Sequence, residues 1–260
     1  MSEIELLFLG TGTSAGVPMI GCHCPVCESP DPHDKRSRPS VLISYDGLRV
    51  LVDTAPELRT QCVTNRIDMI DAVVFTHAHA DHIMGLDDVR RFNAISGKSL
   101  DVWADQFTFD SLSSCFGYAF LRPGEGPNVF RPQLVWRKIE GPFRIGDREW
   151  TPIPLIHGDW PVLGFRVGRL AYCTDVSRIP DDSWALLHDL DVLVLDALQP
   201  RKHPTHFNLE EAIDAAERIG AGQTLFTHIT HAMFHSQTND RLPANMKLAY
   251  DGQRVVASSG

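Results

Sequence analysis

The segment FTHAHADH contains the residues best suited to chemistry. Directly after the apolar run AVVFT, it places His77, His79, Asp81 and His82 within six positions. Alternate side chains of an extended chain share a face, so His77 and His79 can reach one point. Asp81 and His82 fall where the chain is expected to turn into a helix ending near Asn93, which directs them toward a second point. Imidazoles and carboxylates are ligands suited to zinc, manganese or iron, so the segment predicts a metal centre.

The same pattern recurs downstream. Three further metal-compatible residues each follow a strand-like run: His157 follows WTPIPLI, Asp175 follows LAYCT and His228 follows QTLFT. Strand ends that converge at one edge of a sheet are where α/β proteins form their sites. We therefore expect these residues to join the first histidines in one site.

A second cluster lies near the N-terminus, in the stretch GCHCPVC. Its cysteines, Cys22, Cys24 and Cys27, have the close spacing of three ligands of a tetrahedral zinc ion. The remaining cysteines, at 62, 115 and 173, lie in apolar contexts and are expected to be small buried residues. A disulfide framework is not expected in an intracellular chain of this length.

The fourth zinc ligand is expected to be His231. The segment TLFTHITH places His231 three residues after His228, so the two side chains can point in different directions. His23 and His33 are the alternatives, and His23 would be strained because it lies between two ligands. A zinc ion with four protein ligands is structural, and here it would tie the N-terminal loop to the strand that carries His228.

The elements that position these residues predict an α/β protein with two sheets and helices outside. Asp46-Gly47 gives a strong hairpin signal between two β-rich runs, and Asn208, Glu211 and Gly220 are typical of a capped helix. The stretch RPGEGPNVFRP, residues 122–132, is typical of a loop. The predicted strands cover 3–10, 40–45, 48–55, 72–76, 100–104, 149–156, 162–167, 170–174, 192–196 and 223–227, and the predicted helices cover 56–65, 106–117, 180–190 and 208–220.

Composition is ordinary for a globular protein. The 260 residues are 43% hydrophobic and 22% charged, with a formal net charge of −9. That charge disfavours nucleic acid as a partner, because phosphate backbones are held mainly by basic side chains. The N-terminus lacks the basic residues of a signal peptide, and no apolar run approaches the roughly 20 residues of a membrane span. We therefore expect a cytoplasmic protein without a membrane contact.

The motif HAHADH resembles the H-x-H-x-D-H signature of the metallo-β-lactamase fold, and the later His, Asp and His follow in that family's order. The resemblance covers residues 1–260 as a single domain and implies an αββα sandwich of two mixed β-sheets flanked by helices. It implies one metal held by His77, His79 and His157, a second held by Asp81, His82 and His228, and Asp175 bridging both. Asp53 matches the family's early acidic position and is expected to support the ligands.

That ligand set implies hydrolysis by two metals. A water between two ions loses its proton near neutral pH and becomes the nucleophile, so no serine or cysteine nucleophile is needed. The ions also neutralise the charge that develops on the substrate. Asp81 is accordingly counted as both a ligand and a catalytic residue.

The cysteine cluster narrows the resemblance. The C-x-C-x-x-C, the full H-x-H-x-D-H, the late H-x-x-H and the opening GTG-x-x-x-GVP closely resemble PhnP-like phosphodiesterases. This resemblance implies hydrolysis of cyclic or small linear phosphodiesters with two catalytic divalent ions (Mn, Zn or Fe) and one structural Zn. It makes a homodimer plausible. It also implies a catalytic role for His206, which precedes the Asn208 cap in THFNLEEA.

Three alternatives remain open. The fold also serves other hydrolases, such as lactonases. The tRNA 3′-processing nucleases share the metal ligands, but they usually carry an extended RNA-binding arm, and the sequence shows no basic glycine-rich insertion. The coenzyme PQQ synthesis protein PqqB, a non-hydrolytic carrier, shares the cysteine cluster, and its resemblance to hydrolases lies in the fold more than in a complete two-metal site.

Overall fold

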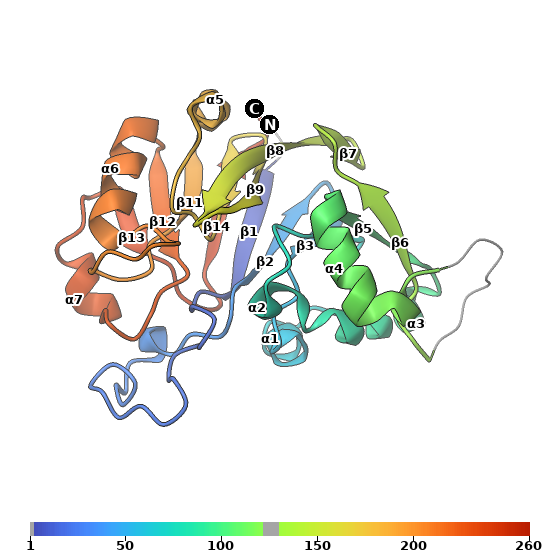
Figure 1. Ribbon diagram of the computed structural model, residues 1–260, viewed down its shortest axis with the longest axis horizontal. Helices are drawn as coiled ribbons and strands as arrows, with labels where there is room; N and C mark the ends of the chain where they lie inside the picture. Colours follow the sequence, from blue (N-terminus) through green and yellow to red (C-terminus); the bar gives the residue numbers. More distant parts are fainter. Residues whose placement is uncertain (1–2, 122–129) are drawn as a thin grey trace.

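The computed structural model describes residues 3–121 and 130–260. Its strands form two seven-stranded sheets that face each other, and helices cover the outer face of each sheet (Figure 1). The predicted αββα sandwich with two mixed sheets is therefore confirmed. Most of the loop predicted at 122–132 lies outside the described residues.

The first sheet has the strand order β14-β1-β2-β3-β4-β5-β6. The strands from β14 to β3 pair antiparallel, and those from β3 to β6 pair parallel. The predicted hairpin joins β2 to β3, with positive φ at Asp46 and Gly47 as in type I′ turns. The strands are β1 (Glu3–Gly10), β2 (Ser40–Tyr45), β3 (Leu48–Val52), β4 (Ala72–Val74), β5 (Leu100–Ala104), β6 (Leu134–Lys138) and β14 (Arg254–Ser258).

The second sheet has the same mixed pattern in the order β13-β12-β11-β10-β9-β8-β7. The strands from β13 to β10 pair parallel, and those from β10 to β7 pair antiparallel. The strands are β7 (Phe143–Ile145), β8 (Arg148–His157), β9 (Trp160–Val167), β10 (Leu170–Cys173), β11 (Val192–Asp196), β12 (Gln223–Thr227) and β13 (Met246–Leu248).

Three apolar clusters hold these layers together. Strand β1 shows how the sequence produces them. Ile4, Leu6 and Phe8 pack in the cluster between the sheets, whereas Leu7 and Leu9 pack in the cluster under the helices of the first half. The period of two residues therefore builds two cores from one strand. A third cluster joins the second sheet to its own helices.

The helices differ from the sequence expectation in two places. They are α1 (Leu58–Thr64), α2 (Ala80–Ile83), α3 (Arg90–Ser96), α4 (Gln106–Phe116), α5 (Asp181–Trp184), α6 (Leu209–Ile219) and α7 (His235–Asn239), with 3₁₀ turns η1 (Pro32–Asp34), η2 (Leu86–Val89), η3 (Gly117–Ala119) and η4 (Ala185–Leu187). The capping box of α6 is present as predicted.

The helix expected to end near Asn93 is broken. The chain forms α2, η2 and α3 instead, because Gly85 passes directly over the backbone after β3. Its N–H donates to the carbonyl of Thr54 at 2.9 Å, and a Cβ at this position would lie 2.1 Å from the carbonyl oxygen of Ala55.

The helix expected over 180–190 is also wrong in its extent. It continues past Trp184 only as a 3₁₀ turn to Leu187, and the extended backbone of His188 (φ −81°, ψ 157°) ends it. Cys115 departs from expectation as well, because it is exposed on α4, whereas Cys62 and Cys173 are buried.

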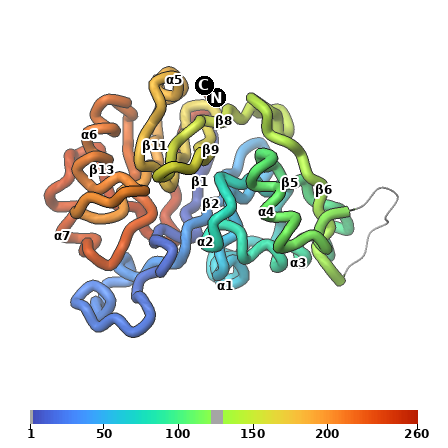
Figure 2. The backbone as a smooth tube through the Cα atoms, in the orientation of Figure 1, coloured from blue at the N-terminus to red at the C-terminus, as the bar shows by residue number. Residues whose placement is uncertain are grey.

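The N-terminal loop between β1 and β2 lies beside the second half of the chain. Figure 2 shows this blue segment under the orange and red segments near α7. Backbone hydrogen bonds link it to the segment after β12: the N–H of Ile229 donates to Thr11 at 2.9 Å, and the N–H of Thr13 donates to Ile229 at 3.1 Å. Among the described residues, no helix is long and apolar enough to cross a membrane.

Candidate dinuclear metal centre

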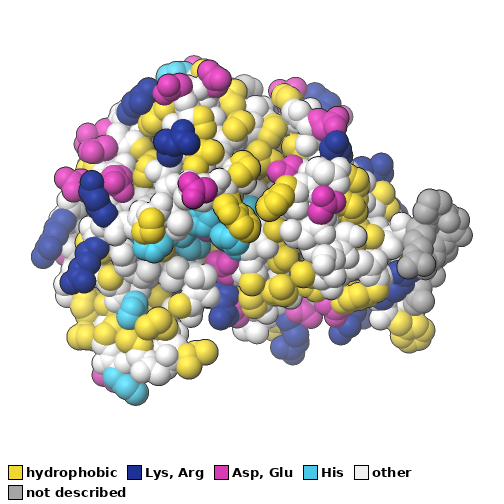
Figure 3. Space-filling model, in the orientation of Figure 1, with side chains coloured by type: hydrophobic (Ala, Val, Ile, Leu, Met, Phe, Trp, Pro, Cys, Tyr) yellow, Lys and Arg dark blue, Asp and Glu magenta, His cyan; other side chains and the backbone are white. Residues whose placement is uncertain are grey.

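The candidate site lies where strand ends of both sheets meet. His157 is the last residue of β8, His228 follows β12 directly, and Asp175 follows β10 by two residues. The HAHADH segment reaches the same point from β4. Figure 3 shows histidine side chains gathered near the centre of one face of the molecule, with acidic and hydrophobic side chains beside them.

One cluster contains His77, His79, His157 and Asp175, whose ligand atoms all lie within 4.8 Å of one another. The Nε2 atoms of His77 and His157 lie 3.8 Å and 4.0 Å from Oδ2 of Asp175. Three nitrogens and one carboxylate oxygen are a suitable donor set for zinc, manganese or iron.

The other cluster contains Asp81, His82 and His228, again within 4.8 Å. Oδ2 of Asp81 lies 3.5 Å from Nε2 of each histidine. The carboxylate of Asp175 approaches these histidines too, with Oδ1 3.3 Å from His82 and Oδ2 3.4 Å from His228. Asp175 therefore lies between the two clusters, in a position to serve both.

Ring nitrogens at the centre of the site have no hydrogen-bond partner. In the described part of the chain this holds for Nε2 of His77, His82 and His228. These three side chains are buried, and a buried polar atom left without a partner costs free energy. Divalent cations would give these lone pairs a partner, so the donor atoms fit metal ions.

The local field also favours cations. Burial alone would lower the pKa of His82, but the carboxylates of Asp175 and Asp81 raise it well above its usual value. The same competition raises the pKa of His228 to about 9, mainly through Asp175. Carboxylates that hold protons on buried imidazoles equally favour divalent ions in their place.

Residues behind the clusters fix the orientation of the rings. Asp53 accepts from Nδ1 of His82 at 2.7 Å, and Thr76 holds this carboxylate through its backbone N–H and hydroxyl, at 2.9 Å and 2.8 Å. Nδ1 of His157 donates to the carbonyl of Thr205 at 2.6 Å. In both rings Nε2 is left for the site, the tautomer that metal binding requires.

The backbone is unusual at three of these positions. Asp53, Asp175 and His228 have φ of 61°, 56° and 61°, in the left-handed region that residues other than glycine seldom adopt. Each lies just after a strand. The sharp turn ends the strand and directs the side chain toward the site, and such strain is typical of functional positions.

His206 lies beside the clusters and is held by a second aspartate. Its ring is 4.4 Å from that of His157 and 4.7 Å from that of His228. Nδ1 donates to Oδ2 of Asp196 at 2.6 Å, and the backbone N–H of Val176 donates to the same oxygen at 2.8 Å. Nε2 of His206 is therefore free to exchange a proton within the site.

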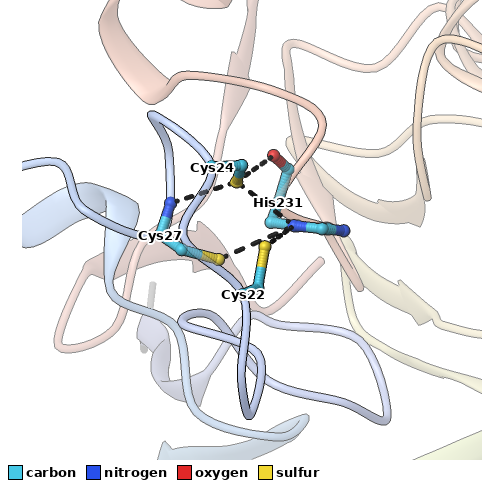
Figure 4. Close-up of side chains that lie close together, drawn as sticks. All are labelled: Cys22, Cys24, Cys27 and His231. Carbon is cyan, nitrogen blue, oxygen red and sulfur yellow. Dashed lines mark hydrogen bonds between the residues drawn. The ribbon is translucent and has the colours of Figure 1, made fainter.

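The four side chains of the cysteine cluster point toward one another (Figure 4). Nδ1 of His231 is 3.2, 3.3 and 3.6 Å from the sulfurs of Cys22, Cys24 and Cys27. Tetrahedral zinc with ordinary Zn–S and Zn–N bonds separates such atoms by about 3.6 Å, so the group fits zinc. His23 points elsewhere and contacts Glu28 at 3.1 Å.

Two hollows flank the metal clusters. One of about 410 Å³ is lined by His79, His157, Gly158, Asp159, Trp160, Pro204 and Thr205. The other, of about 230 Å³, lies between His206 and the N-terminal loop, and is lined among others by Thr13, Gln199 and His203.

Comparison with known proteins supports this arrangement. The model of the beta-lactamase superfamily domain matches residues 48–229. A crystal structure described as a new diphosphatase from the PhnP family is 43% identical, with a TM-score of 0.91 and 98% of each chain covered. An octanoyltransferase of Porphyromonas gingivalis is 38% identical over 97% of this chain, but the chain spans only 51% of that protein. A ribonuclease Z of Mycolicibacterium gilvum is 24% identical, with 99% of this chain and 97% of that protein covered.

These matches define a metal-dependent hydrolase of the metallo-β-lactamase fold. The chain belongs to the beta-lactamase superfamily and, within it, to the PhnP family. This family membership agrees with the resemblance found in the motifs.

The structure brings all eleven predicted metal ligands into three groups, and His206 forms a fourth group with Asp175 and His228. Sequence reasoning missed Asp196 and Thr205. Asp196 could have been predicted in the same way as the other residues, because it too lies at the end of a buried strand. Thr205 acts through its backbone carbonyl, which side-chain motifs do not reveal.

Proposed function

We propose that the protein is a dinuclear-metal phosphodiesterase that hydrolyses cyclic or small linear phosphodiesters. The observation that carries the proposal is the position of Asp175 between two groups of side chains that could each hold a metal ion, with His206 beside both. The relationship to a PhnP-family diphosphatase supports chemistry at phosphorus.

We assign one ion to His77, His79 and His157, the other to Asp81, His82 and His228, and Asp175 to both. Divalent ions in this place supply Lewis acidity for the phosphate oxygens and activate water near neutral pH. Asp53 and the carbonyl of Thr205 keep two of the rings in the ligating tautomer.

His206 then acts on the leaving group. Its Nδ1–H is fixed on Asp196, so the proton available for the reaction is that on Nε2. An alkoxide leaves poorly without a proton, and a proton donor in this place typically raises the reaction rate by about 10²–10⁴-fold. Asp196 stabilises the positive charge that the ring carries before it releases this proton.

A second candidate reaction is hydrolysis of a diphosphate linkage, which the name of the 43% identical relative favours. The site can hold such a substrate in the same way. Its leaving group would be a phosphate, which needs less help from a proton than an alkoxide does. Dependence on His206 therefore separates the two reactions.

The experiment is an assay of manganese- or zinc-loaded protein on a cyclic nucleotide, a glycerophosphodiester, a nucleoside diphosphate and a lactone. Turnover of the phosphodiesters supports the proposal. Turnover of the diphosphate or the lactone alone contradicts it. A structural zinc ion at the cysteine cluster, the single domain over residues 1–260, the homodimer and the cytoplasmic location stay predictions.

A further inference from the structure

Two large aromatic side chains lie exposed beside the candidate metal centre. Trp160 is 47% exposed and Phe107 is 52% exposed. The rings of Trp160 and His79 are 5.3 Å apart, and Phe107 meets Trp160 edge to face at 5.6 Å and 89°. Within the described residues, neither aromatic belongs to an apolar core cluster. Exposed aromatic surface at the entrance of a site is typical of a binding surface.

The position of Trp160 is tied to that of a candidate ligand. Trp160 pairs with His157 across the β8–β9 hairpin, and only Gly158 and Asp159 separate them. Gly158 has φ of 63°, and a Cβ there would lie 2.8 Å from Cγ2 of Thr205. The positive φ of Gly158 and its close contact with Thr205 both restrict the turn. Trp160 therefore has a fixed place relative to the candidate metal ligands.

Phe107 reaches the same place from the other half of the molecule. It lies in the first turn of α4, which is capped by Asp105 accepting from the N–H of Thr108 at 2.7 Å. The aromatic pair therefore joins an element over the first sheet to a hairpin of the second.

The hollow beside Trp160 has a size suited to a small organic group. Its volume of about 410 Å³ lies within the range of roughly 300–1,000 Å³ that is typical of small-molecule sites. His206 lines the other hollow, on the Thr13 side. If His206 serves the leaving group, the hollow at Trp160 takes the group that stays on phosphorus.

We propose that Trp160 and Phe107 form a stacking platform for a nucleobase carried by the group that stays on phosphorus. The proposal rests on the phosphodiesterase function proposed above. Aromatic faces bind bases by stacking. The exposed carboxylate of Asp159 on the same rim can accept hydrogen bonds from sugar hydroxyls or base amino groups, and it repels further phosphates. The platform therefore favours an ester of one nucleotide over a polynucleotide.

The reaction consumes one water. Its oxygen forms the new bond to phosphorus, the bond between phosphorus and the leaving oxygen breaks, and that oxygen takes the proton of His206. The proton that the attacking water releases then replaces the one lost from His206. The products are a nucleoside monophosphate and an alcohol.

The test uses two esters with the same leaving group: thymidine 5′-(p-nitrophenyl phosphate), which carries a base, and ethyl p-nitrophenyl phosphate, which does not. Stacking of a base on one aromatic residue raises affinity by about 5- to 150-fold. Trp160→Leu is expected to raise KM for the thymidine ester at least about fivefold more than it raises KM for the ethyl ester. Trp160→Phe should restore most of the loss, and Tyr118→Leu, at an exposed aromatic residue elsewhere on the surface, should change neither ester.

An equal rise in KM for both esters would place the nitrophenyl group on Trp160 and overturn the proposal, as would no rise for either. If the wild-type protein hydrolyses neither ester, the proposed function fails separately. Calorimetric titration with thymidine 5′-monophosphate then decides the platform: Trp160→Leu must weaken binding, and equal affinity would refute it.

Discussion

Replacing His206 by alanine tests the assignment of the proton donor most directly. The ring is buried beside the metal clusters, and its hydrogen bond to Asp196 leaves Nε2 as the reactive nitrogen. Alanine removes this proton and leaves the seven catalytic ligands in place. We therefore expect His206→Ala to keep its metals and its fold but to lose activity selectively.

The size of the loss depends on the leaving group. An alkoxide needs the proton, so loss of the donor should lower kcat/KM on a glycerol or cyclic ester by about 10²–10⁴-fold, which is roughly 3–5 kcal/mol of transition-state stabilisation. A nitrophenolate leaves without a proton, so kcat/KM on bis(p-nitrophenyl) phosphate should fall less than about tenfold.

The assay compares kcat/KM for the two substrate types in wild-type protein and in His206→Ala, with metal content measured on the same samples. His203→Ala is a matched control, because His203 is an exposed histidine whose ring lies 5.3 Å from that of His206. Asp175→Ala should depress both activities through loss of metal. Equal losses on both substrates in His206→Ala would show that the ring positions the phosphate or the metals, and the reasoning would fail.

Three further outcomes are expected. Elemental analysis of metal-replete protein should approach three ions per chain, and a stable count of one zinc after soaking in manganese would argue against the dinuclear site. Cys24→Ser should lose one ion and lower Tm while keeping the catalytic ions; loss of all activity with zinc and Tm retained would make the cysteine cluster catalytic. Burial, aided by Arg36 and His33, lowers the pKa of His235 to about 4, so between about pH 6.5 and pH 4 only the unfolded state takes up this proton. Stability should therefore fall as pH drops through that window, and His235→Asn should flatten the drop in Tm; an unchanged slope would contradict the assignment.

Much of the fold was predictable from local signals. The period of two in β1, the Asp46-Gly47 turn and the capping box at Asn208 are each encoded within a few residues. Candidate ligands were predictable for a related reason. Strands in an α/β fold end at a common edge, so a histidine or aspartate just past a buried strand can be assigned to that edge without knowledge of the packing.

Features set by tertiary contact were not predictable in this way. The break in the helix after His82 depends on Gly85 passing over the carbonyl of Ala55, on a different segment. The carbonyl of Thr205 accepts a hydrogen bond from the ring of His157 only because its loop folds back over the end of β8. Such partners are distant in sequence and leave no pattern of residue types.

The segment after β12 shows how one short stretch can serve two metal groups. The left-handed backbone at His228 (φ 61°) turns its ring into the catalytic cluster. Ile229 then exchanges backbone hydrogen bonds with Thr11 and Thr13, which makes the N-terminal loop a neighbour of the same stretch. Three residues after His228, His231 meets the cysteines of that loop. Zinc bound there would further stabilise a contact that the backbone already makes, since a structural zinc site stabilises the fold that assembles it. The same loop forms one wall of the hollow at His206. Zinc bound to the cysteines and His231 would therefore also fix the surface that a leaving group would contact.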